Sequence, residues 1–492
     1  MTRRHHPGPP PRPAPRTWLA LLGTLLALSG CSSRERPPVP PDLAAGEDLA
    51  PALPDGSQPV PDAGGPTDVQ PADLQPPTDS GDPRDAGRPR DQGPGPDTAT
   101  PTDGGGSADV DGPAADAQDA RPPADGPPDL QPDLGPGDPP PPLWFLHISD
   151  THVGEKPEMG ELVIRFLEQV PPVVQPLATL HTGDLVDLGG EARQWEEYRA
   201  VIAARTLPYP QYLEIPGNHD VKEGGTPGYQ ASARSFLAGA GMYGETWLDT
   251  PQGRVRIVRA HTADTSLNPA NVLGYFGEEQ QAALLALPVP DPPPRLTLLL
   301  AHHPMNGLDR LMLLGSDQRM QQLIDRVKPQ AYLCGHRHVP YLSWLGQVLS
   351  VQAGSLGKGG IGSPSFMLLA YDQGTISADS VPLQRDEEPV VSWPLLLITR
   401  PADPLLGTTN PLAEPLRAGE QRELRALAFA PAGVDAVDYR WDGGDWVALA
   451  PGTAPLWSAP LPVPAAGVHT LEVRAVAAEG QGTQTRFFQV AP

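Results

Sequence analysis

Residues 143–152 read Leu-Trp-Phe-Leu-His-Ile-Ser-Asp-Thr-His, an apolar run that leads into a carboxylate and an imidazole. An uninterrupted apolar run of this length is typical of a strand that is buried on both faces. Open α/β sheets bind their ligands just beyond the carboxyl ends of their strands. The stretch therefore predicts an α/β fold with Asp150 and His152 at a functional edge of a sheet.

The same arrangement recurs four more times before residue 341. In each case a short apolar run is followed at once by a polar motif that contains Asp, Asn or His. The motifs are, in chain order, Gly183-Asp184, Gly217-Asn218-His219-Asp220, His302-His303-Pro304 and Gly335-His336-Arg337-His338. Together the five motifs offer carboxylates, imidazoles and one amide, a set of donors that suits Mn, Fe or Zn better than Mg or Ca.

The motifs predict a site for two divalent transition-metal ions. Two ions about 3.5–4 Å apart share a ligand, and a carboxylate has two oxygens that can reach both. We expect Asp184 to be this bridge. Asp150 and His152 are two residues apart and can contact one ion, while Asn218 and His302 can contact the other. The remaining expected ligands are His336 and His338, which can serve different ions.

The ordered set of motifs resembles the calcineurin-like metallophosphoesterase superfamily over about residues 144–371. The resemblance implies a sandwich of two mixed sheets flanked by helices. It also implies how the ligands are divided. One ion would take Asp150, His152, Asp184 and His338, and the other would take Asp184, Asn218, His302 and His336.

The resemblance implies catalytic roles for two further residues. The histidine of the Gly-Asn-His-Asp motif contacts substrate in that family, and His219 stands at this position. Asp220 is expected to fix the tautomer of His219 and to raise its basicity. Purple acid phosphatases carry Tyr three residues after the bridging Asp, whereas this chain has Asp187, so a tyrosinate–Fe(III) centre is not expected.

These residues predict a hydrolase that cleaves phosphomonoesters or phosphodiesters. The reaction would be in-line attack by a hydroxide that bridges the two ions, with His219 stabilising charge or protonating the leaving oxygen. The alternative is a binding or adhesion lipoprotein with a vestigial metal site. Metal content and hydrolysis of an aryl phosphate distinguish the two. The sequence separates neither mono- from diesters nor one oligomeric state from another.

Other polar residues near the motifs have less specific interpretations. His147 and His181 lie inside apolar runs, which favours a role in the core or behind the ligands. His303 has two possible roles, a supporting one of this kind or a contact with substrate. Lys222 and Lys358 are either phosphate contacts or solvated loop lysines.

The first 30 residues have the features of a bacterial lipoprotein signal peptide. Four arginines precede an apolar run at 18–28, which is too short to span a bilayer. Leu28-Ser-Gly-Cys31 resembles the lipobox, whose Cys carries the lipid anchor. We therefore expect an exported protein held on a membrane through Cys31, in the outer membrane or at the cell surface rather than in the inner membrane. Cys334, the other cysteine, is expected in the core.

Residues 31–142 predict a disordered tether rich in Pro, Asp and Gly. The chain has 67 Pro and 52 Gly, and residues 32–142 hold 22 acidic residues against six arginines and no lysine. Such a segment cannot bury enough apolar surface to offset its chain entropy. The remainder of the chain is mildly acidic and shows no basic stripe, so no nucleic-acid-binding surface is evident.

Two globular parts are expected after the tether: the metallophosphoesterase domain over 143–390 and an all-β sandwich over 391–492. Short alternating segments such as 437–441 and 470–476, separated by Gly and Pro, favour a β-sandwich. Residues 393–401 and 467–473 resemble the immunoglobulin-like domain that follows the phosphoesterase in a group of eukaryotic membrane metallophosphoesterases.

Overall fold

The structure is a computed structural model that describes residues 139–203, 205–264, 273–305, 312–313, 315–358 and 363–492. The expected signal peptide (1–30), Cys31 and the tether up to residue 138 lie outside the described residues. The described residues belong to one compact unit, Ala117–Pro492. Within them, no helix combines the length and the apolar character needed to cross a membrane.

A five-stranded mixed sheet forms the first β layer, in the order β11-β10-β1-β2-β3. Its strands are β1 (Leu143–Ile148), β2 (Ala178–His181), β3 (Tyr212–Glu214), β10 (Ser365–Asp372) and β11 (Thr375–Pro382). β1, β2 and β3 are parallel, and β10 is antiparallel to β1. Successive side chains of β1 face opposite sides of the sheet, so Leu146 and Phe145 enter different core clusters. Both faces of β1 are therefore buried, as its unbroken apolar run predicts.

A six-stranded mixed sheet forms the second β layer, in the order β4-β5-β6-β7-β9-β8. Its strands are β4 (Gly244–Thr250), β5 (Gly253–Arg259), β6 (Leu296–Leu300), β7 (Ala331–Cys334), β8 (Tyr341–Leu345) and β9 (Val348–Gln352). β5, β6, β7 and β9 are parallel neighbours. Apolar residues of both sheets, among them Leu180, Leu298 and Val351, form one buried cluster. The predicted sandwich of two mixed sheets is confirmed.

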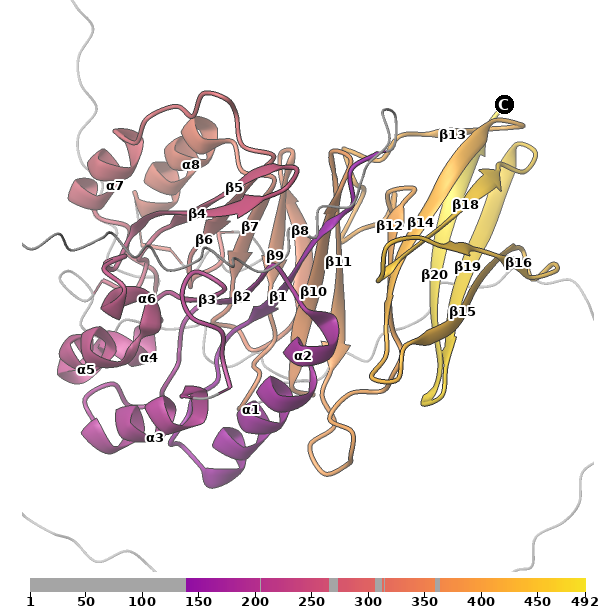
Figure 1. Cartoon of the computed structure of the whole chain (residues 1–492). Coiled ribbons are helices and arrows are strands. Elements are labelled where there is room, and N and C mark those ends of the chain that lie inside the picture. The colour runs from indigo at the N-terminus through magenta and orange to yellow at the C-terminus, as the bar shows by residue number, and fades with distance from the viewer. Residues whose placement is uncertain (1–138, 204, 265–272, 306–311, 314, 359–362) are drawn as a thin grey trace, which may run out of the picture. The chain divides into compact units, whose positions relative to one another are not determined.

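Helices cover the outer faces of this sandwich (Figure 1). Those on the side of the first sheet are α1 (Pro157–Gln169), α2 (Pro171–Val174), α3 (Ala192–Ile202), α4 (Asn218–Val221), η1 (Lys222–Gly224), α5 (Thr226–Ser232) and α6 (Arg234–Leu237). Those beside the second sheet are α7 (Glu278–Leu285) and α8 (Ser316–Val327). Phe166, Trp195 and Tyr229 anchor the first group in its core cluster. Met320 and Leu323 anchor α8 in another cluster, together with Leu299 of β6.

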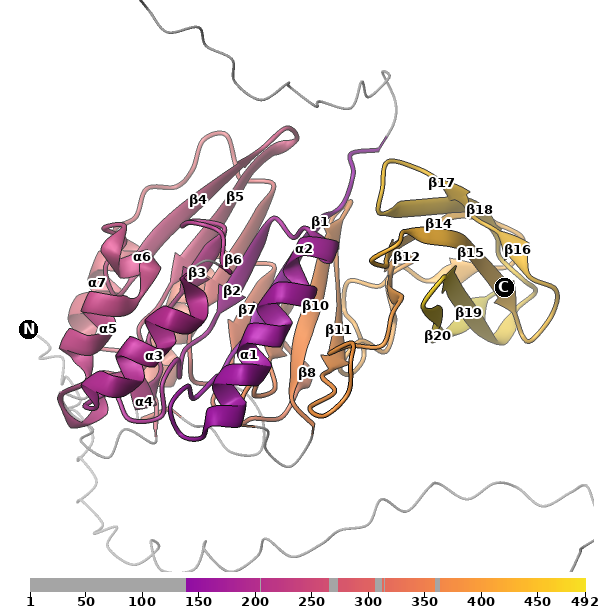
Figure 2. The same cartoon turned by 60° about the horizontal axis from the view of Figure 1, so that its bottom comes forward.

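The C-terminal part is made of two β-sheets, as the alternating pattern predicts. Figure 2 shows its strands, coloured orange to yellow, grouped apart from the helices. One sheet has the order β12-β14-β18-β17 and the other β13-β20-β19-β15-β16. Their bounds are β12 (Leu395–Arg400), β13 (Leu416–Arg417), β14 (Gln421–Phe429), β15 (Val434–Trp441), β16 (Val447–Ala448), β17 (Ala450–Pro451), β18 (Leu456–Pro462), β19 (Gly467–Ala477) and β20 (Gly480–Ala491). Alternate residues of β14, β15 and β19 fill the core between these sheets.

The C-terminal β part shares a core with the α/β part. Trp393 and Phe429 belong to the same buried cluster as Phe166 of α1 and Phe366 of β10. Beside this cluster the Arg425 guanidinium donates to the Asp372 carboxylate at 2.9 Å, and the two side chains are 2% and 1% exposed. The hydroxyl of Thr399 donates to the same carboxylate oxygen at 2.7 Å. We call this region, centred on Asp372 and Arg425, the junction.

Candidate metal centre

All five polar motifs lie at the carboxyl ends of parallel strands. They follow β1, β2 and β3 in the first sheet and β6 and β7 in the second. Hydrogen bonds join neighbouring loops of each sheet: the amide of Gly335 donates to the His302 carbonyl, and the amide of Asp150 donates to the Gly183 carbonyl. Across the sandwich, the amide of His336 donates to the Asp150 carboxylate at 2.9 Å. The structure therefore gathers the seven expected ligands at one edge, which we call the strand-end edge: Asp150, His152, Asp184, Asn218, His302, His336 and His338.

Five of these seven residues have left-handed backbone conformations. Their φ angles are 54° at Asp150, 45° at His152, 54° at Asp184, 74° at His336 and 58° at His338. Residues other than Gly rarely adopt this region, and strained backbone of this kind clusters at functional sites. The fold therefore holds these side chains in orientations that relaxed backbone would not provide.

Two glycines explain how the loops approach one another so closely. A Cβ atom on Gly217 would lie 2.2 Å from the backbone nitrogen of Asp184. A Cβ atom on Gly335 would lie 1.9 Å from the Ser149 hydroxyl oxygen and 2.4 Å from an Asp150 carboxylate oxygen. Any side chain at either position would push an expected ligand out of place.

The first group of donors consists of Asp150, His152, Asp184 and His338. The Nε2 atoms of His152 and His338 are 3.0 Å apart. His338 Nε2 lies 3.3 Å from Asp150 Oδ1, and His152 Nε2 lies 3.7 Å from Asp184 Oδ2. One ligand atom from each residue falls within 4.8 Å of the others, a spacing that could hold one metal ion.

The second group shares Asp184 with the first. Its Oδ2 atom, which faces His152, also lies 3.3 Å from His302 Nε2. The amide oxygen of Asn218 is 3.0 Å from His302 Nε2 and 2.9 Å from His336 Nδ1. One carboxylate oxygen therefore stands between two sets of donors, as a bridging ligand requires.

Hydrogen bonds on the far sides of the rings direct the remaining nitrogens toward the groups. His302 Nδ1 donates to the carbonyl of Thr182 at 2.8 Å, so Nε2 is the nitrogen left to face the other donors. His152 Nδ1 lies 3.2 Å from Asp187 Oδ1, which orients Nε2 in the same way. Imidazoles held by an acceptor on the opposite nitrogen fit metal ions well.

The charges of the site also fit a cation. Burial would raise the pKa of Asp150, but its hydrogen bond to His338 lowers it to about 2. Burial would lower the pKa of His302, but the charge of Asp184 and its hydrogen bond raise it to about 9. Two buried carboxylates thus remain ionised and draw a proton onto a neighbouring histidine. A metal ion would take the place of that proton.

His219 stands beside the first group, with its ring centroid 4.6 Å from that of His152. Its Nδ1 atom is 2.6 Å from the carbonyl oxygen of Asp187 and 2.9 Å from Lys222 Nζ. The carbonyl only accepts and the ammonium only donates, so one of these contacts forms at a time. Both use Nδ1, which leaves Nε2 to face whatever enters the site.

The prediction that Asp220 orients the His219 ring is wrong. Asp220 Oδ1 accepts from the amides of Leu185 and Val186 at 2.8 and 3.1 Å, and Oδ2 accepts from the Gly217 amide at 2.8 Å. His219 and Asp220 are consecutive in α4, and successive helical residues point about 100° apart. The buried Asp220 therefore fastens the loops that carry Asp184 and Asn218, while His219 faces outward.

Asp187 has contacts that the sequence did not reveal. Its Oδ1 atom is 3.2 Å from His152 Nδ1, 3.5 Å from His219 Nδ1 and 3.4 Å from Lys358 Nζ. The hydrogen bond to His152 lowers the pKa of the Asp187 carboxyl well below its usual range. Its position three residues after Asp184, beyond the same strand, is the one signal that could have suggested a supporting role.

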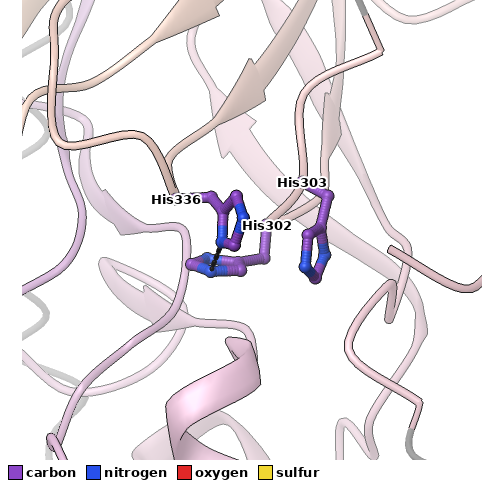
Figure 3. A group of neighbouring side chains, drawn as sticks. All are labelled: His302, His303 and His336. Atoms are coloured by element: carbon purple, nitrogen blue, oxygen red, sulfur yellow. Dashed lines mark hydrogen bonds between the residues drawn. The ribbon is translucent and has the colours of Figure 1, made fainter. Parts of the chain in front are cut away.

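The other residues singled out in the sequence are buried in most cases. His147 Nε2 contacts the Thr182 hydroxyl at 2.9 Å, and His181 Nε2 contacts the Thr151 hydroxyl at 3.1 Å. Both therefore lie behind the ligands. Cys334 is fully buried, Lys358 pairs with Glu155 at 2.8 Å, and Arg337 is exposed. His303 lies beside His302 and His336, as Figure 3 shows.

Residues 143–340, which hold all five motifs, match the family described as calcineurin-like phosphoesterase. This segment is a calcineurin-like phosphoesterase domain. Its clustered Asp and His donors could hold metal, which supports a metal-dependent phosphoesterase.

Several solved structures are similar to the phosphoesterase domain at low identity. A dimetal phosphatase from Danio rerio is 15% identical, with 51% of this chain and 98% of that chain covered and a TM-score of 0.39. The inner membrane complex anchor GAP50 of Plasmodium is 11% identical, with 51% and 86% covered and a TM-score of 0.36. Phosphopantetheinyl hydrolase from Mycobacterium tuberculosis is 13% identical, with 43% and 89% covered and a TM-score of 0.30. The comparison with curated proteins gave no match.

Proposed function

We propose that the protein hydrolyses phosphomonoesters or phosphodiesters with two divalent transition-metal ions. The observation that carries the proposal is the position of Asp184 Oδ2, 3.7 Å from His152 Nε2 and 3.3 Å from His302 Nε2. Among the described residues, Asp184 is the one expected carboxylate ligand with an oxygen within 4 Å of histidine ring nitrogens from both groups of donors. The ligand set contains no thiolate, and it suits Mn, Fe or Zn.

In this proposal each group of donors holds one ion. Asp150, His152 and His338 bind the first, Asn218, His302 and His336 bind the second, and Asp184 binds both. When bound, the two ions would polarise the phosphoryl oxygens and activate the attacking water. The Asn218 amide is neutral, which limits the negative charge that an anionic phosphate ester meets on entry.

His219 is the proposed proton donor to the leaving oxygen. When Lys222 donates to Nδ1, the neutral ring must carry its proton on Nε2, the atom that faces the site. Burial lowers the pKa of His219, which favours the neutral ring. In this neutral form the Nε2–H group can stabilise the charge on the leaving oxygen by a hydrogen bond. To transfer the proton itself the ring has to be the imidazolium, whose Nδ1–H would donate to the Asp187 carbonyl, and it returns to the neutral form after the transfer.

A metal-by-substrate panel tests the function. The purified protein, stripped of metal and reloaded with Mn, Fe or Zn, is assayed with an aryl phosphate and a bis-aryl phosphate. We expect hydrolysis of at least one ester that depends on added metal and saturates near two equivalents. A protein that binds metal but cleaves neither ester would favour the adhesion alternative.

We further propose that the mature protein is a lipid-anchored exported protein, with Cys31 as the anchor, 32–142 as tether and 391–492 as an immunoglobulin-like domain. The lipobox-like Leu28-Ser-Gly-Cys31 and the apolar run before it support this location. Mass spectrometry of the mature N-terminus should find diacylglyceryl-Cys31 and no residues 1–30. An unmodified Cys31 or an intact Met1 would contradict the proposal.

A further inference from the structure

His303 is fully buried next to the second group of donors, yet its Nε2 atom has no hydrogen-bond partner in the described structure. Its ring centroid lies 5.0 Å from that of His302 and 4.4 Å from that of His336. Figure 3 shows the three rings together. A ring nitrogen from each lies within 4.8 Å of the others, so three histidines could be taken for a metal site of their own.

The hydrogen bonds of Thr262 exclude His303 Nε2 as a ligand in this arrangement. The Thr262 hydroxyl oxygen accepts from the amide of His302 at 3.2 Å and from the amide of His303 at 3.1 Å. Both of its lone pairs are then used, so its single proton must go to His303 Nδ1, which lies 3.0 Å away. A ring that accepts at Nδ1 carries its own proton on Nε2. His303 Nε2 is thus an N–H donor, and a metal ion needs a lone pair.

A buried donor without an acceptor is uncommon, because a protein normally pairs the polar groups it removes from water. His303 directly follows the expected ligand His302 in the chain, and both side chains are fully shielded from solvent. The His303 ring lies within 5.0 Å of the rings of both His302 and His336, measured between centroids, so the site formed with these two histidines is the nearest place from which an acceptor could come. We propose that His303 Nε2–H donates to a phosphoryl oxygen of the substrate and is a substrate-contacting residue rather than a metal ligand.

This inference rests on the proposed phosphoesterase function, and it adds a specific donor for the phosphate. An N–H group aimed at an anionic oxygen makes a stronger hydrogen bond than one between neutral groups. His303 would contact the substrate from the His302 side, while His219 contacts it from the side of the first group. Donors on two different sides fit the oxygens of a tetrahedral phosphoryl group better than those of a planar carboxylate.

Two matched substitutions separate the nitrogens of the ring. The amide of His303→Gln can reach the position of Nε2, whereas the shorter amide of His303→Asn reaches the position of Nδ1. His303→Leu removes both. For each metal-loaded variant we would measure the bound metal by elemental analysis and the affinity for inorganic phosphate by calorimetry. Thr262→Ser, which keeps the hydroxyl, is the control.

We expect every variant to keep the wild-type metal content. His303→Gln and Thr262→Ser should bind phosphate nearly as well as wild type, and His303→Asn and His303→Leu about 10- to 100-fold more weakly. Equal affinities for the Gln and Asn variants would overturn the inference, since both keep a polar side chain of similar size. Loss of one metal equivalent in His303→Leu would show that His303 is a ligand. A wild-type protein that binds metal but no phosphate would refute the proposed function itself.

Discussion

The junction and the strand-end edge both bury carboxylates, but they balance the charge differently. At the junction, Asp372 pairs with the guanidinium of Arg425 at 2.9 Å. At the strand-end edge, Asp150 and Asp184 pair with histidines. Arginine keeps its proton at any ordinary pH, whereas histidine can give up a proton and then offer a lone pair. The charge of Asp372 at the junction is therefore balanced within the protein, by Arg425. The carboxylates of the strand-end edge are instead arranged to bind a cation.

The largest expected effect comes from the shared carboxylate. Asp184→Ala should remove both ions and lower turnover more than about a hundredfold. Loss of a residue that only supports a metal ligand already costs about 10- to 100-fold, and Asp184 is itself a ligand of both ions in the proposal. Asn218→Ala should weaken mainly one ion. Elemental analysis and turnover of the two variants test this. Retention of about two ions by Asp184→Ala would show that the bridge is misassigned.

Substitution of His219 should separate chemistry from metal binding at the same edge. His219→Ala should keep its metal and lose about 10²–10⁴ in turnover, the usual range for a positioned acid or base. Alkyl esters should lose more than aryl esters, because a poor leaving group needs the proton more. Equal losses for both ester types, or loss of an ion, would be incompatible with a proton donor.

Breaking the junction should affect stability and leave metal content unchanged. Arg425→Leu leaves Asp372 buried without its partner, which should cost about 3–5 kcal/mol of unfolding free energy. The double variant Asp372→Leu with Arg425→Leu should recover most of this loss, because no buried charge remains. Urea denaturation of both variants measures the difference. If the double variant were the less stable of the two, the ion pair would not be the cause.

Asp187→Asn should act on the strand-end edge through His152. The neutral amide makes a weaker partner for His152 Nδ1, so the affinity for one metal ion should fall about 10- to 100-fold. Metal titration detects this loss without any assay of turnover. Asp442→Asn is the matched control, since the partner of Asp442, His469, lies in the C-terminal β part, outside the site. Unchanged metal affinity in Asp187→Asn would limit Asp187 to contacts with His219 and Lys358.

The buried carboxyl of Glu214 differs from those of both regions because it keeps its proton up to near neutral pH. Burial raises the pKa of Glu214 from 4.5 to about 7. At this group the folded state then binds more protons than the unfolded state between these pH values, so the contribution of Glu214 to stability is greatest below pH 4.5 and is lost as the pH rises through 7. The slope from this group is at most about 1.4 kcal/mol per pH unit. Glu214→Gln should flatten the stability profile in this window, as thermal unfolding at several pH values would show.

The sequence predicted the strands with their polar ends because an unbroken apolar run has one physical explanation, burial on both faces. β1 (Leu143–Ile148) ends just before Asp150, as the apolar run at its start predicts. The supporting role of Asp187 was missed, and Asp220 was assigned to the wrong partner. Both sets of contacts depend on where the side chains point after the loops have folded, and the residue type alone does not predict that direction.

The point where the chain enters β1 has a mechanical consequence. The Pro140 carbonyl accepts from Arg425 Nη2 at 3.2 Å, and the Pro141 carbonyl accepts from Arg295 Nη2 at 2.5 Å. A pulling force on the N-terminal segment would therefore act first on the hydrogen bonds that these two arginines make. β1 has six residues, and at about 3.3 Å per residue its two ends are roughly 20 Å apart. The loops that carry Asp150 and Asp184 lie beyond the far end of this strand, so tension on the segment reaches them last.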